Sequence, residues 1–237
     1  MKIALIGYGK MGHEIEKIAR SRGHVISVII DQNNLTDFNS DEFKSSDVAI
    51  EFTRPEVAID NYLKCFKSGI PVVSGTTGWL DKMTYIVDTC KQLEQGFFYA
   101  SNFSIGVNLF FELNKKLAQL MSKHSDYSVS LEEIHHTQKL DAPSGTAISL
   151  AEQIISNHPK ITRWGLNDNN ESTLKITAHR IGQVPGTHNI VYESKVDKIE
   201  ISHEAKNREG FATGAVLAAE FMQNKKGIYN MQDLLTL

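Results

Sequence analysis

The run Ile3-Ala4-Leu5-Ile6-Gly7-Tyr8-Gly9-Lys10-Met11-Gly12 decides the fold of the first half of the chain. Its first four residues form a short apolar stretch typical of a buried strand, and Gly-x-Gly-x-x-Gly follows directly. A helical pattern then begins, with Met11, Ile15 and Ile18 on one face. A second apolar stretch, Val25 to Ile30, stops at Asp31. These segments predict a β-α-β unit with a glycine-rich turn between strand and helix.

The glycine-rich turn has the spacing of a dinucleotide-binding loop. Gly7 permits the tight turn, Gly9 lets the backbone approach a pyrophosphate, and Gly12 allows the helix to pack closely on the strand. Asp31 can accept hydrogen bonds from an adenosine ribose. Because the strands, the helix and the acid are in register, we expect dinucleotide binding. The cofactor-binding residues expected here are Gly7, Tyr8, Gly9, Lys10, Met11, Gly12 and Asp31.

Asp31 also bears on the choice between NADH and NADPH. A carboxylate at this position repels a 2′-phosphate, and Gln32-Asn33-Asn34 supplies no arginine to neutralise one. We therefore expect NADH to be preferred. Lys10 is the one nearby cation that softens this preference, so acceptance of NADPH stays open.

Strand and helix patterns continue to alternate up to about residue 100. Apolar stretches at 48–52, 71–73 and 97–100 alternate with helical patterns that begin at Pro55 and near Leu80. The alternation predicts an open, doubly wound parallel sheet of the Rossmann type, whose ligands bind at the carboxyl ends of the strands. Two turns fall at such ends, although ordinary turn chemistry explains their composition equally well. They are Gly75-Thr76-Thr77 and Ala100-Ser101-Asn102-Phe103.

The pattern changes beyond Phe103. Residues 104–123 are expected to form a long helix with an apolar stripe in the core, made of Phe110, Leu113, Leu117, Leu120 and Met121. Apolar and polar residues then alternate with period two around 128–132, 174–179, 190–192 and 199–201. This alternation indicates strands with one solvated face, hence a mixed or antiparallel sheet. We expect an α/β chain whose second, α+β domain follows the parallel sheet.

Size and charge limit the classes of partner. The chain has 237 residues, 41% of them hydrophobic, and a formal net charge of −3, which gives no electrostatic reason to expect nucleic acid or an anionic membrane. No apolar run approaches the roughly 20 residues that span a bilayer, and the strand pattern at the N-terminus leaves no room for a secretory signal. Cys65 and Cys90 are most simply free thiols, so we expect a cytoplasmic location.

The run from Glu133 to Thr146 carries the chemistry of the second half. It contains two imidazoles, His135 and His136, and the ammonium of Lys139. Imidazole is the usual proton donor near neutral pH. Pro143-Ser144-Gly145-Thr146 predicts a turn that opens a helix, and free backbone N–H groups at a helix start attract carboxylate or phosphate. The combination indicates a site for a small anionic substrate that must be protonated.

One long motif resembles a known family. His135-His136-x-x-Lys139-x-Asp141-Ala142-Pro143-Ser144-Gly145-Thr146 resembles the substrate-site signature of the 4-hydroxy-tetrahydrodipicolinate reductase (dihydrodipicolinate reductase) family of bacterial lysine biosynthesis. Further segments are similar to that family along nearly the whole chain: Gly75 to Gly78, Asn102 to Asn108, Arg180 to His188 and His203 to Arg208. The similarity is weakest at 33–46 and 161–172. The glycine loop is shorter than in many relatives, with Lys10 where they have arginine.

The resemblance implies a two-domain oxidoreductase. Residues 1–103, completed by 212–237, would form the dinucleotide-binding domain. Residues 104–211 would form the substrate-binding and oligomerisation domain of a homotetramer. The implied activity is NAD(P)H-dependent reduction of 4-hydroxy-tetrahydrodipicolinate, a small cyclic dicarboxylate, to tetrahydrodipicolinate in lysine and diaminopimelate biosynthesis.

The resemblance also implies roles for single residues. His135 would donate the proton, assisted by Lys139, and His136 would help to hold the substrate. Ser144, Gly145 and Thr146 would bind one carboxylate at the helix start. The turns at 75–77 and 100–103 would contact the nicotinamide side of the cofactor.

Other interpretations stay open at this point. Asp141 could simply fix the turn before Pro143 or pair with Lys139. A metal site could draw on Glu132, Glu133, His135, His136, His179 and His188, but adjacent histidines on a strand point to opposite faces and no helical His-x-x-x-His is present, so we expect no metal. The chain could also be another nicotinamide enzyme, such as an amino-acid or sugar dehydrogenase, or a nucleotide sensor that binds NADH without consuming it.

Overall fold

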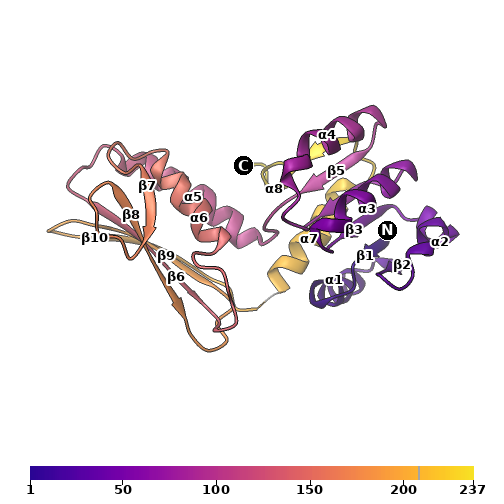
Figure 1. Cartoon of the computed structure of the whole chain (residues 1–237), viewed down its shortest axis with the longest axis horizontal. Coiled ribbons are helices and arrows are strands. Elements are labelled where there is room, and N and C mark those ends of the chain that lie inside the picture. Colours follow the sequence, from indigo (N-terminus) through magenta and orange to yellow (C-terminus); the bar gives the residue numbers. More distant parts are fainter. Residues whose placement is uncertain (208) are drawn as a thin grey trace. The chain divides into compact units, whose positions relative to one another are not determined.

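The structure is a computed structural model that describes residues 1–207 and 209–237 (Figure 1). Arg208, the last residue of one family-like segment, lies outside this described part. The chain divides into two compact units, Met1–Ile105 with Glu209–Leu237 and Gly106–Arg208. Among the described residues, every helix is too short or insufficiently apolar to cross a membrane.

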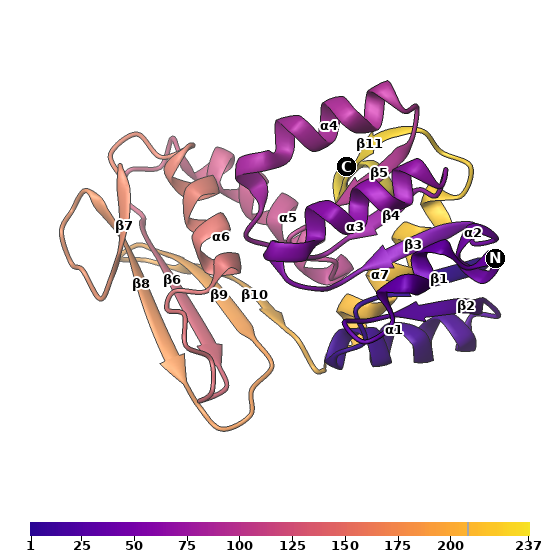
Figure 2. The same ribbon diagram turned by 45° about the vertical axis from the view of Figure 1, so that its right-hand side comes forward.

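The first unit is built on a six-stranded parallel sheet (Figure 2). β1 (Lys2–Ile6) pairs with β2 (Val25–Ile30) on one side and with β3 (Val48–Glu51) on the other. Beyond β3 the sheet continues through β4 (Val72–Ser74), β5 (Gly96–Tyr99) and β11 (Gly227–Tyr229), again in parallel. The parallel sheet predicted from the alternating pattern is confirmed.

Helices cover both faces of this sheet because successive strand residues point to opposite sides (Figure 2). On one face, buried side chains of α3 (Pro55–Lys67) and α4 (Met83–Gln92) pack on Ala4, Ala49, Val72 and Phe97. On the other, α1 (Lys10–Ser21) and α7 (Glu209–Met222) pack on Ile3, Leu5, Ile50, Val73 and Phe98. Shorter elements complete the unit: η1 (Leu35–Asn39), α2 (Asp41–Lys44), η2 (Leu80–Lys82) and α8 (Met231–Leu235).

The turn from β1 into α1 admits only glycine at two positions. Gly7 has a φ of +91°, and a Cβ on it would lie 2.1 Å from the carbonyl oxygen of Phe52. A Cβ on Gly12 would lie 2.4 Å from the carbonyl oxygen of Gly7. A side chain at position 7 would therefore push the turn away from the segment after β3, and one at position 12 would push the start of α1 away from the turn.

The second unit is a five-stranded mixed sheet in the order β10-β9-β6-β8-β7. Its strands are β6 (Ser128–His135), β7 (Arg163–Leu166), β8 (Thr173–Arg180), β9 (Thr187–Glu193) and β10 (Lys198–Glu204). β8 runs parallel to β6 and β7, whereas β9 runs antiparallel to β6 and β10. The predicted mixed sheet with one covered face is confirmed: α5 (Ile105–Met121) and α6 (Gly145–Ile155) lie on that face (Figure 1).

The predicted apolar stripe of α5 was wrong in part. Leu113 and Leu120 are 51% and 59% exposed, whereas Asn114 is fully buried. The Asn114 amide donates to the carbonyl oxygen of Leu150 (3.1 Å) and to Oε1 of Gln153 (2.9 Å), both on α6. Hydrogen bonds to α6 thus place a polar side chain in the core-facing stripe, whose buried residues are Val107, Phe110, Asn114, Ala118 and Met121.

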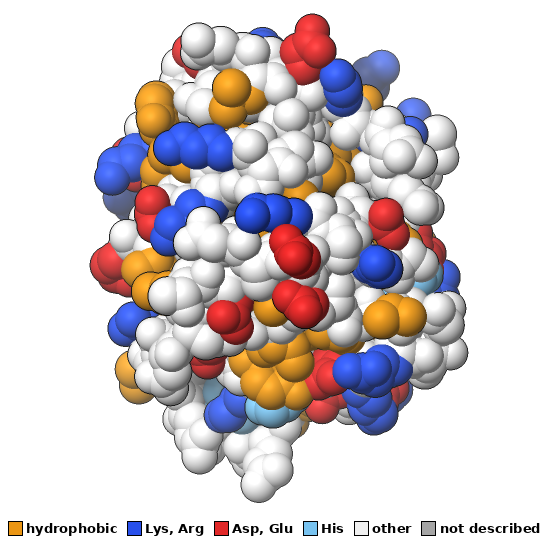
Figure 3. Space-filling view, turned by 90° about the vertical axis from the view of Figure 1, so that its right-hand side faces the viewer, with side chains coloured by type: hydrophobic (Ala, Val, Ile, Leu, Met, Phe, Trp, Pro, Cys, Tyr) orange, Lys and Arg blue, Asp and Glu red, His pale blue; other side chains and the backbone are white. Residues whose placement is uncertain are grey.

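Both cysteines lie in helices and are free thiols, as expected. Cys65 in α3 and Cys90 in α4 are buried and free, and burial raises the pKa of each thiol, to about 11 for Cys90. Such thiols are unreactive at neutral pH. On the face of the molecule shown in Figure 3, Lys and Arg side chains are interspersed with Asp and Glu, in keeping with the small formal charge.

Because α5 buries Phe110 and exposes Leu113, substitutions at these two positions should lower the free energy of unfolding by different amounts. Phe110→Ala should lower the free energy of unfolding by about 3–5 kcal/mol, because it removes a buried ring from the core of the second unit. Leu113→Ala should change it by less than about 0.5 kcal/mol, because the leucine is half exposed. Urea denaturation followed by circular dichroism measures both. Equal losses in the two variants would show that the stripe is misassigned.

Candidate functional site

A cavity of about 470 Å³ lies in the first unit at the carboxyl ends of β1, β2 and β3. Since β2 and β3 lie on opposite sides of β1, the cavity occupies the point at which the order of the strands reverses. In open α/β sheets, this is where ligands bind. Four of the predicted cofactor residues, Gly7, Tyr8, Gly9 and Asp31, line it.

The geometry of this cavity fits a dinucleotide. A Cβ added to Gly9 would meet nothing within 4 Å, so the backbone at this point is open to a phosphate. Asp31 is exposed at the end of β2, and its backbone N–H donates to Asn34 Oδ1 at 2.8 Å. The remaining predicted loop residues begin α1: Lys10 is exposed, Met11 packs against the core, and Gly12 is buried.

Sequence reasoning missed the contribution of α3 to this cavity. Arg54, at the start of α3, and Asp60, Asn61 and Lys64 within it line the cavity together with Asp31. Lys64 pairs with Asp60 at 2.6 Å. The expectation that Lys10 is the one nearby cation was therefore wrong. The signal was available, because α3 follows the third strand of a parallel sheet and so begins at the same edge.

The two predicted nicotinamide-side turns follow neighbouring strands, β4 and β5. Thr76 is buried, and its hydroxyl accepts a hydrogen bond from the backbone of Thr53 at 2.8 Å. Gly75 and Thr77 flank it. After β5, Ala100 and Phe103 are buried in the core, Ser101 is exposed, and Asn102 Oδ1 accepts from the backbone of Ser104 at 2.9 Å. Two turns from adjacent strand ends are thus held by internal hydrogen bonds.

A buried carboxylate, Glu51, links the ends of β3 and β4 by hydrogen bonds. Glu51 is fully buried at the end of β3 and accepts hydrogen bonds from the hydroxyls of Thr53 and Ser74. Burial raises the pKa of this carboxyl, although its hydroxyl partners oppose the effect. Tyr62 of α3 joins the group through the Ser74 hydroxyl at 2.7 Å.

In the second unit, the predicted helix start is confirmed. Ser144 is the N-cap of α6, and its hydroxyl accepts from the backbone N–H of Ala147 at 3.1 Å. The same hydroxyl lies 3.2 Å from Nε2 of His188, so it is already engaged and buried. Gly145 is exposed and Thr146 half-buried at the first turn, which leaves this end of α6 accessible to an anion.

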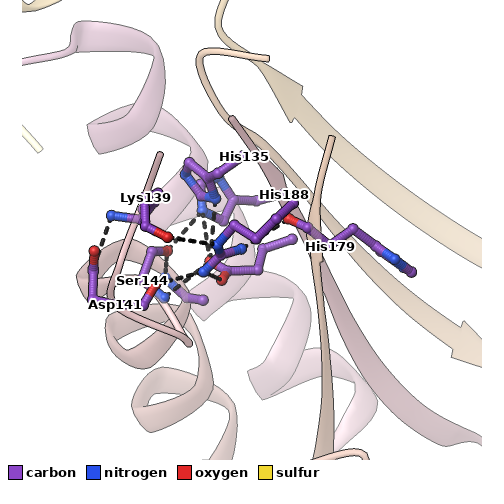
Figure 4. A network of polar contacts seen from close by, with 9 residues as sticks. His135, Lys139, Asp141, Ser144, His179 and His188 are labelled. Atoms are coloured by element: carbon purple, nitrogen blue, oxygen red, sulfur yellow. Dashed lines mark hydrogen bonds and ion pairs between the residues drawn. The ribbon is translucent and has the colours of Figure 1, made fainter. Parts of the chain in front are cut away.

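His135 ends β6 and is buried among charged groups (Figure 4). Its Nδ1 lies 3.5 Å from Oε2 of Glu133, and the same carboxylate oxygen is 3.9 Å from Nε2 of His188. Burial lowers the pKa of His135, while the Glu133 charge opposes this effect. His136 is half-buried in the turn that follows.

Lys139 and Asp141 form an ion pair at 2.8 Å beside these histidines (Figure 4). The pairing weighed for Asp141 is thus confirmed, and the Lys139 ammonium holds the pKa of the Asp141 carboxyl below its usual range. The structure brings His135, Lys139 and Ser144 into one group at the end of β6. Sequence reasoning placed Glu133 among metal ligands and gave Arg180 no role, yet both belong to this group: Arg180 Nη2 donates to Glu133 Oε1 at 3.0 Å.

The metal interpretation rested on six residues, and the structure gathers only three of them among its described residues. Donor atoms of Glu133, His135 and His188 lie within 4.8 Å of one another. Glu132 and His179 instead pair with each other at 3.0 Å. Arg180, bonded to Glu133, and the nearby Lys139 would repel a divalent cation at this position. The arrangement therefore favours proton chemistry.

The first unit has a strand-end cavity with a glycine loop. The second has a histidine–lysine group beside an accessible helix start. Together they indicate an oxidoreductase with two functional units. The comparisons with known proteins agree. Residues 1–103 match the family model "Dihydrodipicolinate reductase, N-terminus", and residues 106–235 match "Dihydrodipicolinate reductase, C-terminus". The chain belongs to the dihydrodipicolinate reductase family.

Individual relatives cover nearly the whole chain. A 4-hydroxy-tetrahydrodipicolinate reductase of Christiangramia forsetii is 52% identical over 236 residues, which are 100% of this chain and 98% of the relative. A reductase of the same name from Neisseria meningitidis is 34% identical over 200 residues, 81% of this chain and 73% of the relative. The solved dipicolinate-bound dihydrodipicolinate reductase of Paenisporosarcina sp. TG-14 shares the fold, with a TM-score of 0.76, 23% identity and 97% coverage of each chain.

The buried His188 predicts a pH dependence of stability. Burial, with the neighbouring His135, lowers the pKa of His188 to about 4, whereas an unfolded histidine titrates near 6.5. Between these values the unfolded chain binds more protons, so the free energy of unfolding falls as the pH falls. From pH 7 to pH 5 the wild-type protein should lose about 2 kcal/mol more than His188→Gln. Urea denaturation at several pH values measures the difference, and parallel curves would contradict it.

Proposed function

We propose that the chain reduces 4-hydroxy-tetrahydrodipicolinate to tetrahydrodipicolinate with a reduced nicotinamide cofactor, as a step of lysine and diaminopimelate biosynthesis. The net change consumes one hydride and one proton and releases the hydroxyl group as water. Family membership supports the reaction. The observation that carries the assignment of residues is the single group of His135, Lys139 and the accessible start of α6.

His135 is the proton donor in this proposal. Loss of the hydroxyl group and a neighbouring hydrogen as water would form a conjugated carbon–carbon double bond. The cofactor, when bound, would supply the hydride to that bond, and the electron-rich carbon that results must be protonated. His135 is buried near Glu133 and Lys139, so its imidazole is largely kept from bulk water. A positioned acid of this kind contributes roughly 10²–10⁴ to the rate.

The other residues hold the substrate. Lys139 supplies a positive charge beside the imidazole, and His136 in the adjoining turn adds a contact. One carboxylate binds at the first turn of α6, to the backbone N–H groups of Gly145 and Thr146 and to the threonine hydroxyl. Ser144 mainly stabilises the start of α6 as its N-cap residue, because its hydroxyl already accepts a hydrogen bond from the backbone N–H of Ala147.

The first unit binds the cofactor in this proposal. The pyrophosphate lies at the loop of Gly7 to Gly12, the ribose hydroxyls bond to Asp31, and the nicotinamide side meets the turns at 75–77 and 100–103. The negative charge of Asp31 favours NADH. Arg54, which lines the same cavity, offsets part of that charge, so NADPH is also accepted, less efficiently.

The assembly and domain roles complete the proposal. Residues 1–103 with 212–237 bind the cofactor, and 104–211 bind the substrate and build the homotetramer expected from the family resemblance. The tetramer and the cytoplasmic location stay predictions.

Substitution of the proton donor and its cation tests the chemistry. His135→Gln and Lys139→Met should each lower kcat by about 10²–10⁴-fold, because the carbanion is no longer protonated efficiently. Their Kd for NADH, measured by fluorescence titration, should stay within twofold of wild type. The assay follows loss of NADH absorbance with the condensation product of pyruvate and aspartate semialdehyde. Wild-type turnover in both variants would exclude the assignment, and NADH binding without consumption would indicate a sensor.

Cofactor choice has its own test. Asp31→Ser should shift the ratio of kcat/KM for NADH to that for NADPH by about tenfold toward NADPH, equivalent to about 1.4 kcal/mol, because the repelling carboxylate is gone. Arg54→Gln should move the ratio the opposite way. Steady-state kinetics with both cofactors decides, and an unchanged ratio in both variants would exclude these residues from cofactor selection.

A further inference from the structure

Glu133 is a buried carboxylate that the proposed mechanism leaves unused. It lies in the middle of the sheet on β6, with its side chain 0% exposed. Oε2 accepts a hydrogen bond from the backbone N–H of Ser144 at 3.0 Å, and Oε1 accepts one from Arg180 at 3.0 Å. These hydrogen bonds outweigh burial and lower the pKa of Glu133, so the group is an anion at neutral pH.

The position of Glu133 gives the two nitrogens of His135 different surroundings. Nδ1 is buried without a hydrogen-bond partner among the described residues, and Glu133 Oε2 lies 3.5 Å from it. A small rotation of the ring brings the two atoms into hydrogen-bond distance. Nε2 is on the other side of the ring, next to Gly186: a Cβ added to this glycine would lie 3.0 Å from Nε2. A side chain at this position would therefore crowd Nε2.

Arg180 connects the same carboxylate to the lysine loop. Its guanidinium bonds to Glu133 and also donates to the backbone carbonyl oxygens of Asp141 and, at 3.3 Å, Lys139. This ion pair, whose carboxylate is fully buried, thus contacts the strand that carries His135 and the loop that carries Lys139. The Ser144 N–H bond adds the start of α6.

We propose that Glu133 is the positioning residue of this site: its carboxylate binds Nδ1–H of His135 so that Nε2 faces the substrate, and through Arg180 it sets the place of the Lys139 loop. The inference rests on the proposed role of His135 as proton donor. Glu133 itself does not touch the substrate.

The charges around His135 determine in which direction the pH dependence of turnover shifts when one of them is removed. Burial lowers its pKa, as do Lys139 and Arg180, whereas Glu133 and Asp141 raise it. His188 packs against the ring with 5.1 Å between centroids. Since the donor must be protonated, turnover falls as the pH rises through the pKa of His135. Removal of the Glu133 charge lowers that pKa, so the fall should begin at lower pH.

Glu133→Gln, with Glu132→Gln as its matched control, tests the proposal. Glu132 is the neighbouring residue of the same strand and instead contacts His179 and Asn189. Glu133→Gln should lower kcat about 10- to 100-fold and shift the alkaline limb of the pH profile to lower pH. Glu133→Asp should restore the limb, because the charge returns. Glu132→Gln should keep wild-type kcat and profile. A wild-type limb in folded Glu133→Gln would overturn the proposal.

A second measurement needs no folded variant of Glu133. ¹⁵N NMR of histidine-labelled wild-type protein, with the His135 signal assigned by its loss in His135→Gln, reports which ring nitrogen carries the proton. We expect neutral His135 to be protonated on Nδ1, and protonation on Nε2 would contradict the proposal. Failure of the proposed function is distinguishable, since it appears as wild-type turnover in His135→Gln itself.

Discussion

The ion pair of Glu133 and Arg180 is the interaction on which the arrangement of the second unit depends. A carboxylate that is removed from water is costly unless opposite charge and hydrogen bonds compensate it. Here Arg180 from β8 and the Ser144 N–H at the start of α6 provide that compensation. Because each partner comes from a different segment, satisfying one charge also aligns a strand, a helix and a loop.

The first unit follows the same physical rule with neutral partners. Glu51 is buried at the end of β3 and is satisfied by hydroxyls from the segments after β3 and on β4. Its partners are dipoles rather than a cation, and burial therefore raises its pKa, whereas the arginine and the Ser144 hydrogen bonds lower that of Glu133. In both units an internal acid orders the backbone near residues proposed to meet a ligand. Neither acid needs to contact that ligand.

Many elements of the fold and of the candidate site could be predicted from the sequence, because the local pattern and the tertiary structure agree there. The Gly7–Gly12 loop, the strands up to β5 and the helix start at Ser144 each have a local signal, and each formed where it was expected. Long-range partners have no such signal. The cavity contributions of Arg54 and Lys64 appear only when α3 is placed beside β1 and β2. Arg180 pairs with Glu133 because β8 lies beside β6, which spacing along the chain does not reveal.

Helix α5 shows how pattern and packing can disagree. Leucine is a better core residue than asparagine by transfer free energy, and Leu113 was therefore placed in the predicted core stripe. Asn114 is buried instead, because its amide donates hydrogen bonds to two oxygen atoms on α6. Likewise β11 and α8 are too short, at three and five residues, for a periodic pattern to register.

The first unit is formed by two segments that are far apart in the sequence, which affects the order in which its parts are synthesised on the ribosome. Its edge strand β11 and its core helix α7 come from residues 209–229, after the whole of the second unit has been translated. Until then β5 is an unpaired edge, and the surface that receives Ala215, Val216 and Met222 lacks its cover. An open strand edge invites pairing with another chain. During synthesis all residues of the second unit are therefore made before the first unit gains β11 and α7, and the first unit keeps an unpaired strand edge for longer.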